Sequence, residues 1–381
     1  MKIKRYISKK IMKFLKPGLV IVLYGPRQSG KTTFLETTFN NSEIKKMEKL
    51  KFVSGEDRFV QKDLSSQSIE KLRSFLGDTT LLIIDEAQHI PNIGINLKLI
   101  VDHLKKIKVI VSGSASFDLS NKIGEPLTGR KITLFLYPLW VKEIIENKGK
   151  LFYESLFETH LIYGSYPKLF KLPSLKEKRR YLYEIINSYL LKDILILEDI
   201  RRSKKIKDLL SLLAYQIGKE VSLSELGNNL ELNKKTVERY LDLLEKSFVI
   251  FNIRGFSRNL RKEIYKNSRW YFWDNGVRNA LINNFNPLSL RDDVGALWEN
   301  YVVIERLKKQ AYREIYSNNY FWRTYDKKEI DWVEERDGKL FGFEIKWKER
   351  KKVKAPKDWL ETYRNASFKI INQENYLDFI L

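Results

Sequence analysis

The 381-residue sequence contains no cysteine and only three histidines, His89, His103 and His160. Without cysteine the chain forms no disulfide, no thiolate zinc site and no cysteine nucleophile, which fits a reducing cytoplasm. The three histidines are too scattered to indicate a histidine-based metal site. No apolar run approaches the roughly 20 residues of a membrane-spanning helix. We therefore expect a cytoplasmic protein with no membrane partner.

Acidic residues are few compared with basic ones. The chain has 48 Asp and Glu and 70 Lys and Arg, which gives a net charge of +22. Such an excess favours binding to polyanions such as DNA. A lysine-rich surface of the kind found in thermophiles would produce the same composition. With 43% hydrophobic residues, a chain of this length has enough apolar material for two or three domains, each with its own core.

The first 18 residues, MKIKRYISKKIMKFLKPG, place apolar side chains at helical spacing among lysines. The lysines interrupt any apolar core, so a signal peptide is not expected. A basic amphipathic helix can lie on a membrane surface. Packing of its apolar side against the following domain is the favoured interpretation.

A short apolar run, LVIVLY at 19–24, is typical of a buried parallel strand, and GPRQSGKTT follows it directly. This order predicts a phosphate-binding loop whose backbone N–H groups surround ATP phosphates. Lys31 would reach the β- and γ-phosphates, and the Thr32 hydroxyl would ligate Mg²⁺. The candidate nucleotide-binding residues are Gly25, Pro26, Arg27, Gln28, Ser29, Gly30, Lys31, Thr32 and Thr33.

A second apolar run, LLIID at 81–85, ends in Asp85 and Glu86. A carboxylate at the end of a strand about 50 residues after a phosphate loop predicts a second Mg²⁺ ligand, here Asp85. Glu86, next to it, would orient or deprotonate the attacking water. Both carboxylates are therefore candidate site residues.

Two further polar positions follow predicted strands. KVIVSGSAS ends in Ser112 and Ser114, and such hydroxyls either sense the γ-phosphate or belong to a Ser/Gly-rich turn. Arg130 lies just before another strand and would stabilise transition-state charge as an arginine finger, in cis or from a neighbouring subunit. The second option implies a homo-oligomer.

The segments GPRQSGKTT, LLIIDEAQ, VIVSGSAS and LTGRKITLFLYPLWVKE, in this order, resemble the AAA-type domain of a widespread prokaryotic family of predicted ATPases. YGSYPKLF at 163–170 and YFWDNGVRNAL at 271–281 resemble parts of the family's C-terminal module of uncertain function. The resemblance implies an α/β P-loop ATPase with ATP and Mg²⁺ as cofactors. Trp140, where a small residue is expected, is a departure from the pattern.

Residues 142–215 have a mostly helical pattern and are interpreted as a helical lid or linker. After them, VSLSELGNNLELNKKTVERYLDLLEKSFVIFNI predicts a helix that Gly227 and its two asparagines break after Leu226. A second helix, capped by Asn233, would bury Val237, Tyr240, Leu241 and Leu244. A helix, a turn, a helix and a strand in this order are typical of a winged helix.

The second of these helices carries Lys234, Lys235 and Arg239 on its outer side, where recognition helices contact DNA. Arg258, with Arg254, Arg261 and Lys262, follows in the predicted wing and would meet phosphates. The alternative is a winged helix used for protein docking, because Glu238 and Asp242 interrupt the positive surface. The aromatic residues at 271–273 are expected to fill a core and not to stack on bases.

The last part of the chain combines a helix at 295–309 carrying Glu299 with a strand ending near Asp331 and Trp332. After a turn at Asp337 and Gly338, the next strand carries Glu344 and Lys346 on one face. This set resembles the restriction-endonuclease-like superfamily, although Ile330 replaces its usual proline. The resemblance implies Asp331 and Glu344 as ligands of Mg²⁺ or Mn²⁺, with Glu299 and Lys346 as catalytic partners.

We therefore predict four segments: an α/β P-loop AAA-type ATPase domain at 1–141, a helical lid at 142–215, a winged helix at 216–285 and an α/β restriction-endonuclease-like domain at 286–381. The first hypothesis is a Mg-ATP hydrolase whose nucleotide state controls DNA engagement. A second hypothesis adds metal-dependent DNA cleavage. The third is a nucleotide-gated DNA- or protein-binding switch with an inactive nuclease-like domain.

Overall fold

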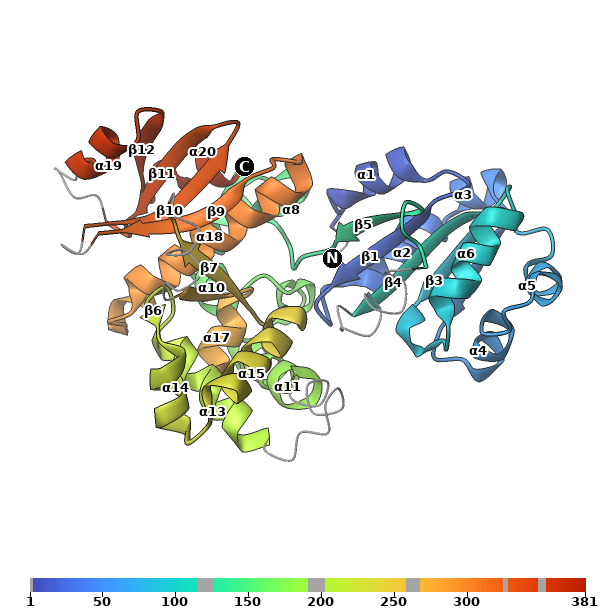
Figure 1. Cartoon of the computed structure of the whole chain (residues 1–381), viewed down its shortest axis with the longest axis horizontal. Coiled ribbons are helices and arrows are strands. Elements are labelled where there is room, and N and C mark those ends of the chain that lie inside the picture. The colour runs from blue at the N-terminus through green and yellow to red at the C-terminus, as the bar shows by residue number, and fades with distance from the viewer. Residues whose placement is uncertain (1–2, 115–125, 191–202, 258–267, 325–327, 349–353) are drawn as a thin grey trace. The chain divides into compact units, whose positions relative to one another are not determined.

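The structure is a computed structural model that describes residues 3–114, 126–190, 203–257, 268–324, 328–348 and 354–381. These residues form two compact units (Figure 1). The N-terminal unit comprises Lys2–Leu139 with Lys246–Phe248, and the C-terminal unit comprises Trp140–Glu245 with Val249–Leu381. The break lies two residues before the predicted boundary at 141. In the described part of the chain, no helix combines the length and the apolar composition needed to cross a membrane.

The N-terminal unit is built on five parallel strands in the order β2-β3-β4-β1-β5. All residues of β1 and β3 are buried, as expected for apolar strands covered on both faces. Because β4 lies between β1 and β3, the three strands that carry predicted site residues end side by side. The strands are β1 (Val20–Gly25), β2 (Leu50–Ser54), β3 (Leu81–Asp85), β4 (Lys108–Ser114) and β5 (Lys131–Phe135).

Helices cover this sheet. One core cluster joins strand residues such as Val22 and Ile84 to apolar residues of α4, α5 and α6. The basic helix α1 buries Ile7 and Ile11, which confirms that it packs against protein. The helical segments are α1 (Ile7–Phe14), α2 (Lys31–Phe39), α3 (Ser42–Met47), α4 (Arg58–Leu64), α5 (Ile69–Leu76), η1 (Ala87–His89) and α6 (Ile93–His103).

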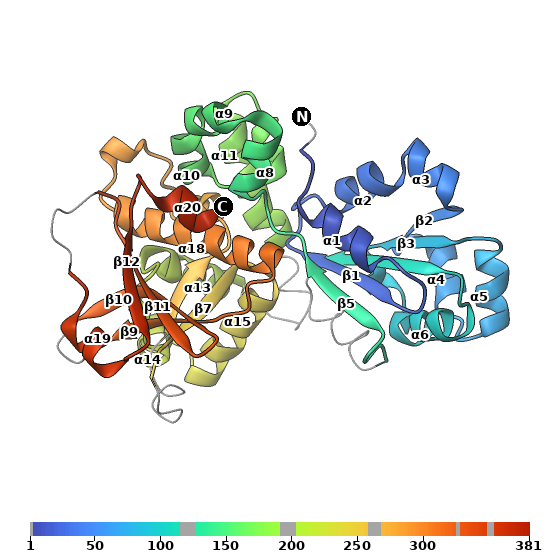
Figure 2. The same cartoon turned by 90° about the horizontal axis from the view of Figure 1, so that it is seen from above.

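The C-terminal unit contains one seven-stranded sheet in the order β12-β11-β10-β9-β7-β8-β6. Strand β7 pairs in parallel with β9, so the segments predicted as a winged helix and as a nuclease-like domain share a sheet. Figure 2 shows α18 next to this sheet, where it contacts β8 and β11. The strands are β6 (Glu220–Val221), β7 (Ile250–Gly255), β8 (Ser268–Phe272), β9 (Asn318–Arg323), β10 (Glu329–Arg336), β11 (Lys339–Ile345) and β12 (Ala366–Ile371).

The predicted hairpin is confirmed, since β10 and β11 are antiparallel and Arg336 pairs with Lys339 across the turn. Asp337 and Gly338 have φ of 50° and 72°, the left-handed pair that tight hairpin turns require. The strand boundaries differ from the prediction, because β9 and β10 are two strands and not one. Asp331 is consequently the third residue of β10 and does not end a strand.

Several of the remaining helices, among them α10, α11, α13, α14, α15 and α17, share a core with β7 and β8. This core runs from Ile162 to Phe285, so the predicted boundary at 215 cuts through it and the helical segment is not separate from the region after it. The helical segments are α8 (Val141–Lys148), α9 (Lys150–Ser155), α10 (Phe157–Tyr163), η2 (Pro167–Phe170), α11 (Leu175–Glu184), η3 (Ile185–Leu190), α13 (Ser203–Tyr215), α14 (Leu223–Leu230), α15 (Lys234–Lys246), α17 (Asn275–Leu281), η4 (Leu288–Leu290), α18 (Val294–Arg313), α19 (Lys357–Thr362) and α20 (Tyr376–Ile380).

The predicted helix pair is present as α14 and α15, with one correction. The backbone N–H of Thr236 donates to Asn233 Oδ1 at 2.8 Å, which confirms the predicted cap. Gly227 does not break α14, which continues to Leu230. A Cβ at Gly227 would lie 2.7 Å from the carbonyl oxygen of Leu232, so glycine serves there as a point of close approach.

The two family-like motifs of the C-terminal unit pack directly on each other. The backbone N–H of Ser165 donates to Asp274 Oδ2 at 2.7 Å, and a Cβ at Gly276 would lie 1.9 Å from the carbonyl oxygen of Tyr163. A Cβ at Gly164 would lie 2.0 Å from Asp274 Oδ1. The glycines of both motifs therefore allow two segments of the chain, more than 100 residues apart in sequence, to cross at close distance.

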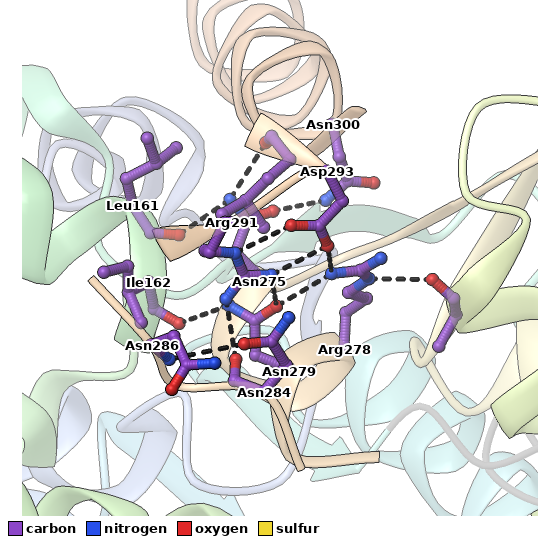
Figure 3. Close-up of polar contacts among 12 residues, drawn as sticks. Leu161, Ile162, Asn275, Arg278, Asn279, Asn284, Asn286, Arg291, Asp293 and Asn300 are labelled. Atoms are coloured by element: carbon purple, nitrogen blue, oxygen red, sulfur yellow. Dashed lines mark hydrogen bonds and ion pairs between the residues drawn. The ribbon is translucent and has the colours of Figure 1, made fainter. Parts of the chain in front are cut away.

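Buried side chains beside this crossing bind several segments together (Figure 3). Asn275 donates to the carbonyl oxygens of Leu161 and Leu297, at 2.9 and 3.1 Å. Asp293 accepts from both Arg278 and Arg291. These side chains satisfy one another's hydrogen-bonding groups. The polar residues of the motif YFWDNGVRNAL therefore have a structural role in the C-terminal unit.

His160 is buried near the same crossing, and its Nε2 lies 2.9 Å from Ser165 Oγ. Burial, and secondly the charge of Lys308, lowers the pKa of His160 to about 3. A histidine in an unfolded chain titrates near 6.5. Below about pH 6.5 the unfolded state therefore binds a proton that the folded state rejects, and the free energy of unfolding decreases as the pH falls.

We expect His160→Gln to lose less stability than the wild type when the pH falls from 7 to 5, by about 2 kcal/mol. Urea unfolding followed by tryptophan fluorescence measures this, because all eight tryptophans lie in the C-terminal unit. The other two histidines belong to the N-terminal unit, so they do not contribute to the signal. Equal losses in both proteins would contradict a buried neutral His160.

Candidate functional site

The predicted phosphate-binding loop leaves the end of β1 and enters α2. A Cβ at Gly25 would lie 2.3 Å from the carbonyl oxygen of Leu136, so only glycine fits there. Gln28 and Gly30 have φ of 65° and 92°, the left-handed conformation that turns successive N–H groups to one side. The Lys31 ammonium donates to the carbonyl oxygens of Gly25 and Pro26, at 2.9 and 3.2 Å. The loop thus has the form that a phosphate cradle requires.

Asp85 ends β3 beside this loop. Its Oδ2 accepts from the Thr32 hydroxyl at 2.5 Å, and its Oδ1 accepts from the Ser112 hydroxyl. A hydroxyl and a carboxylate oxygen are the hard ligands that Mg²⁺ takes from a protein when nucleotide phosphates supply others. Thr32 and Asp85, predicted from positions 53 residues apart, are therefore brought together as a fitting Mg²⁺ site.

Of the two predicted serines, the structure connects Ser112 to the carboxylate of Asp85. Ser114 is paired with Gly25 in the register of β1 and β4, which places its backbone beside the start of the loop. Ser112 is therefore the serine that links β4 to the carboxylate of β3.

Glu86 follows Asp85 with a left-handed backbone, φ 49°, and its carboxylate accepts from Gln88 Nε2 at 2.5 Å. Gly55, the residue directly after β2, donates its N–H to the Asp85 carbonyl oxygen at 2.7 Å. A Cβ at Gly55 would lie 2.3 Å from the carbonyl oxygen of Glu86. Gly55 is therefore a positioning residue for Glu86 that no sequence motif indicated.

We expect Gly55→Ala to lower kcat for ATP by about 10-fold to 100-fold, because the added methyl group displaces the backbone that aims Glu86. The affinity for ATP should change little, since the phosphate loop is untouched. Gly295→Ala is a matched control, because a Cβ there meets no atom within 4 Å. A loss of ATP affinity with unchanged kcat would contradict this role of Gly55.

Arg130 requires a correction. It precedes β5, whose first residue Lys131 pairs with Val20, while the phosphate loop leaves the other end of β1. The two ends are roughly 15 Å apart along the strand direction. The Arg130 Nε donates to Asp102 Oδ1 at 2.6 Å. A finger role in cis is therefore wrong, and a role toward a neighbouring subunit stays a prediction.

Arg5 was missed by sequence reasoning, since it is one basic residue among many near the start of the chain. Only 6% of its surface is exposed. Its guanidinium donates to the Ser29 carbonyl oxygen at 3.0 Å and to the Tyr137 carbonyl oxygen at 2.5 Å. Arg5 thus connects the phosphate loop, at Ser29, to the segment after β5, at Tyr137.

In the C-terminal unit, the structure brings together the predicted nuclease-like residues. Lys346 Nζ lies 2.6 Å from Glu344 Oε1 and 3.7 Å from Asp331 Oδ2. Glu299 on α18 accepts from the Tyr271 hydroxyl at 2.7 Å. Asp331 and Glu344 are buried, and Glu299 is half-buried. We call Glu299, Glu329, Asp331, Glu344, Arg269, Tyr271 and Lys346 the carboxylate cluster.

The electrostatics of this cluster show strong crowding. Burial, and then the charge of Asp331, raises the pKa of Glu299 to about 8. The same two causes raise the pKa of Glu344 to about 7. Burial lowers the pKa of Lys346, but the neighbouring carboxylates outweigh it and the pKa is raised.

A resident metal ion does not fit the cluster as the structure shows it. Among the described residues, no group of three or more His, Cys, Asp or Glu side chains is arranged to hold a metal ion. Arg269, a residue that sequence reasoning missed, donates to Asp331 and to Glu329 instead. The prediction of Asp331 and Glu344 as metal ligands is therefore not supported by this arrangement.

The predicted DNA-contacting residues Lys234, Lys235 and Arg239 are all exposed on α15. Lys234 lies 3.9 Å from Glu238 at their charged atoms, so part of its charge is balanced. Arg254 is exposed on β7. Arg258, with Arg261 and Lys262, lies outside the described residues. The winged-helix assignment and its DNA contacts stay predictions.

Three family models match the chain. The model described as an AAA domain matches residues 18–145. The models described as Domain of unknown function (DUF8612) and Domain of unknown function (DUF4143) match residues 154–288 and 294–376. The AAA match covers the phosphate loop, Asp85, Glu86 and the five-stranded sheet.

Relatives are similar in sequence over most of the chain. An uncharacterised protein of Mycobacterium tuberculosis is 26% identical over 346 residues, which cover 90% of this chain and 74% of that protein. An uncharacterised protein of Methanocaldococcus jannaschii is 24% identical over 347 residues, which cover 86% of this chain and 75% of that protein.

Among solved structures, the Signal Transduction ATPase with Numerous Domains (STAND) protein with a tetratricopeptide repeat sensor from Pyrococcus horikoshii is 16% identical, with a TM-score of 0.32. The match covers 81% of this chain and 46% of that chain, and the low TM-score means a weak whole-chain likeness. The family matches therefore give an AAA domain followed by two domains of unknown function, and the relatives named above are prokaryotic proteins that match most of the chain.

Proposed function

We propose that the chain is a Mg-ATP hydrolase whose nucleotide state controls how its C-terminal unit engages DNA. The observation that carries the ATPase part is the contact of Thr32 with Asp85 beside the left-handed loop of Gln28 and Gly30. Lys31 and the N-terminus of α2 would hold the phosphates. Glu86 would orient or deprotonate the attacking water. Mg²⁺, when bound with ATP, would neutralise charge on the phosphate oxygens.

The DNA part rests on charge and exposure. The net charge of +22 favours a polyanionic partner, and α15 presents three exposed basic side chains. Arg254 adds an exposed guanidinium on β7, the strand that follows α15. These features support contacts with phosphates and do not specify a base sequence.

Coupling between the units is tested by tryptophan emission. Because the N-terminal unit contains no tryptophan, any change in emission on ATP binding originates in the C-terminal unit. We expect Mg-ATP to change the emission and the DNA affinity of the wild type, and to leave Lys31→Ala unchanged. Wild-type ATP turnover with emission and DNA affinity independent of ATP would overturn the coupling.

DNA engagement is tested with Lys234→Glu/Lys235→Glu. Because two phosphate contacts would be lost, we expect duplex affinity to fall by about 100-fold at low salt and the slope of log K against log salt to decrease by about 2. Lys45→Glu/Lys46→Glu is the matched control, since it makes the same charge change on exposed residues of α3. Equal losses from both pairs would show that net charge alone is responsible.

The second candidate is a nucleotide-gated binding switch with an inactive nuclease-like part. The ion pairs of Arg269 with Asp331 and Glu329 favour it over DNA cleavage. Plasmid integrity measured with Mg²⁺ or Mn²⁺, together with ATP turnover, separates the candidates. Nicking that disappears in Glu344→Ala would establish cleavage, and negligible ATP turnover with ATP-dependent binding would establish the switch.

A further inference from the structure

The carboxylate cluster contains a buried guanidinium from a different part of the sheet. Arg269 belongs to β8, the strand that also pairs with β6 and β7, and only 4% of its surface is exposed. Its Nη1 donates to Asp331 Oδ1 at 3.4 Å, and its Nη2 donates to Glu329 Oε2 at 2.7 Å. A cation is thus already present among the carboxylates that a metal ion would use.

The oxygens of Asp331 face donors of the protein itself. Its Oδ2 accepts from the backbone N–H of Ile345 at 2.9 Å, and its Oδ1 accepts from Arg269. Glu344 Oε1 lies 2.6 Å from the Lys346 ammonium, while its Oε2 is buried without a partner among the described residues. A magnesium-type cation takes about six oxygen ligands, and one uncommitted carboxylate oxygen does not provide such a site.

The cations nearest these carboxyl groups belong to the protein itself. Four carboxyl groups, Glu299, Glu329, Asp331 and Glu344, surround two cationic groups, Arg269 and Lys346. Tyr271, two residues after Arg269 on β8, donates its hydroxyl to Glu299. Arg269 therefore connects β8 to carboxylates of β10, and Tyr271 connects β8 to the carboxylate of Glu299 on α18.

We infer that the Arg269 guanidinium takes the cation position of the carboxylate cluster, so that the cluster is a metal-free junction between β8 and the hairpin of β10 and β11. A guanidinium offers fixed donors to carboxylates and stays charged at all working pH values, so it satisfies these groups permanently. Removing the Arg269 guanidinium would leave the carboxylate oxygens of the cluster without this donor, and they could then bind a divalent cation. This inference does not depend on ATP hydrolysis, and its test uses no nucleotide.

The test is a Mn²⁺ titration of the full chain, with free Mn²⁺ measured by electron paramagnetic resonance. Wild type and Glu344→Gln are expected to bind the same number of Mn²⁺ ions, because the cluster binds none and any site at Asp85 remains. Arg269→Gln is expected to bind one additional ion. The double variant Arg269→Gln/Glu344→Gln is expected to lose this ion again.

A Mn²⁺ site that is present in the wild type and absent in Glu344→Gln would overturn the inference. A folded Arg269→Gln protein that gains no ion would also overturn it. Tryptophan emission checks the fold of each variant. Arg269→Lys keeps a cation in the cluster and is expected to bind no additional ion, so a gain in that variant would show that shape and not charge excludes the metal.

Discussion

Glu86→Gln is expected to bind ATP as tightly as the wild type and to hydrolyse it about 100-fold to 10,000-fold more slowly. The amide cannot accept a proton from the attacking water, but it keeps the size of the carboxylate and its contact with Gln88. Single-turnover experiments measure the chemical step, and a fluorescent ATP analogue measures binding.

Lys31→Ala is the companion variant for this experiment. It removes the ammonium that lies at the start of the phosphate loop, next to the Gly25 carbonyl oxygen, so nucleotide binding itself should be lost. The two variants therefore separate binding from chemistry. Turnover of Glu86→Gln at the wild-type rate would mean that another group activates the water.

Arg306→Met is expected to destabilise the C-terminal unit by about 3–5 kcal/mol. The Arg306 guanidinium makes two parallel bonds to Glu334, at 2.6 and 2.8 Å, and Glu334 is fully buried. It also donates to the carbonyl oxygen of Phe379 at 2.9 Å, which ties α18 to α20. Truncation leaves the carboxylate of Glu334 buried without its main partner, and that loss dominates the cost.

Urea unfolding followed by tryptophan fluorescence measures this cost. Because the penalty comes from the unpaired charge, Arg306→Met/Glu334→Leu should recover a large part of the lost stability. Lys150→Met is the control, since its ion pair with Glu154 is exposed and is expected to contribute no more than about 1 kcal/mol. A double variant as unstable as the single one would show that packing, and not charge, carries the effect.

Much of the geometry of the candidate nucleotide site could be predicted from sequence, because its parts are local. The loop from Gly25 to Thr33 is one continuous segment between a strand and a helix, and Asp85 and Glu86 directly follow an apolar run. Parallel strands end at one edge of a sheet, so the contact between Thr32 and Asp85 follows from these motifs. The hairpin around Gly338 was predictable for the same reason.

The residues that were missed act through long-range contacts. Arg5 reaches Tyr137, Gly55 abuts Glu86, and Arg269 reaches Asp331 across 62 positions of the chain. Nothing in the local pattern around these residues distinguishes them from other basic residues or glycines. For Arg130 the sequence left a role in cis or toward a neighbouring subunit open, because the motif order does not reveal at which end of the sheet an arginine before a strand will lie.

The parallel pairing of β7 with β9 has consequences for truncated fragments of the protein and for recombination between related genes. Arg254 pairs with Tyr320 and Gly255 with Phe321, so the two halves of the C-terminal unit supply neighbouring strands of one sheet. A fragment ending near residue 285 would keep β8 beside β7 but leave the opposite edge of β7 without β9, and an open strand edge invites aggregation. Recombination between the two halves would incur the same penalty, so they should be exchanged between genes as a single piece.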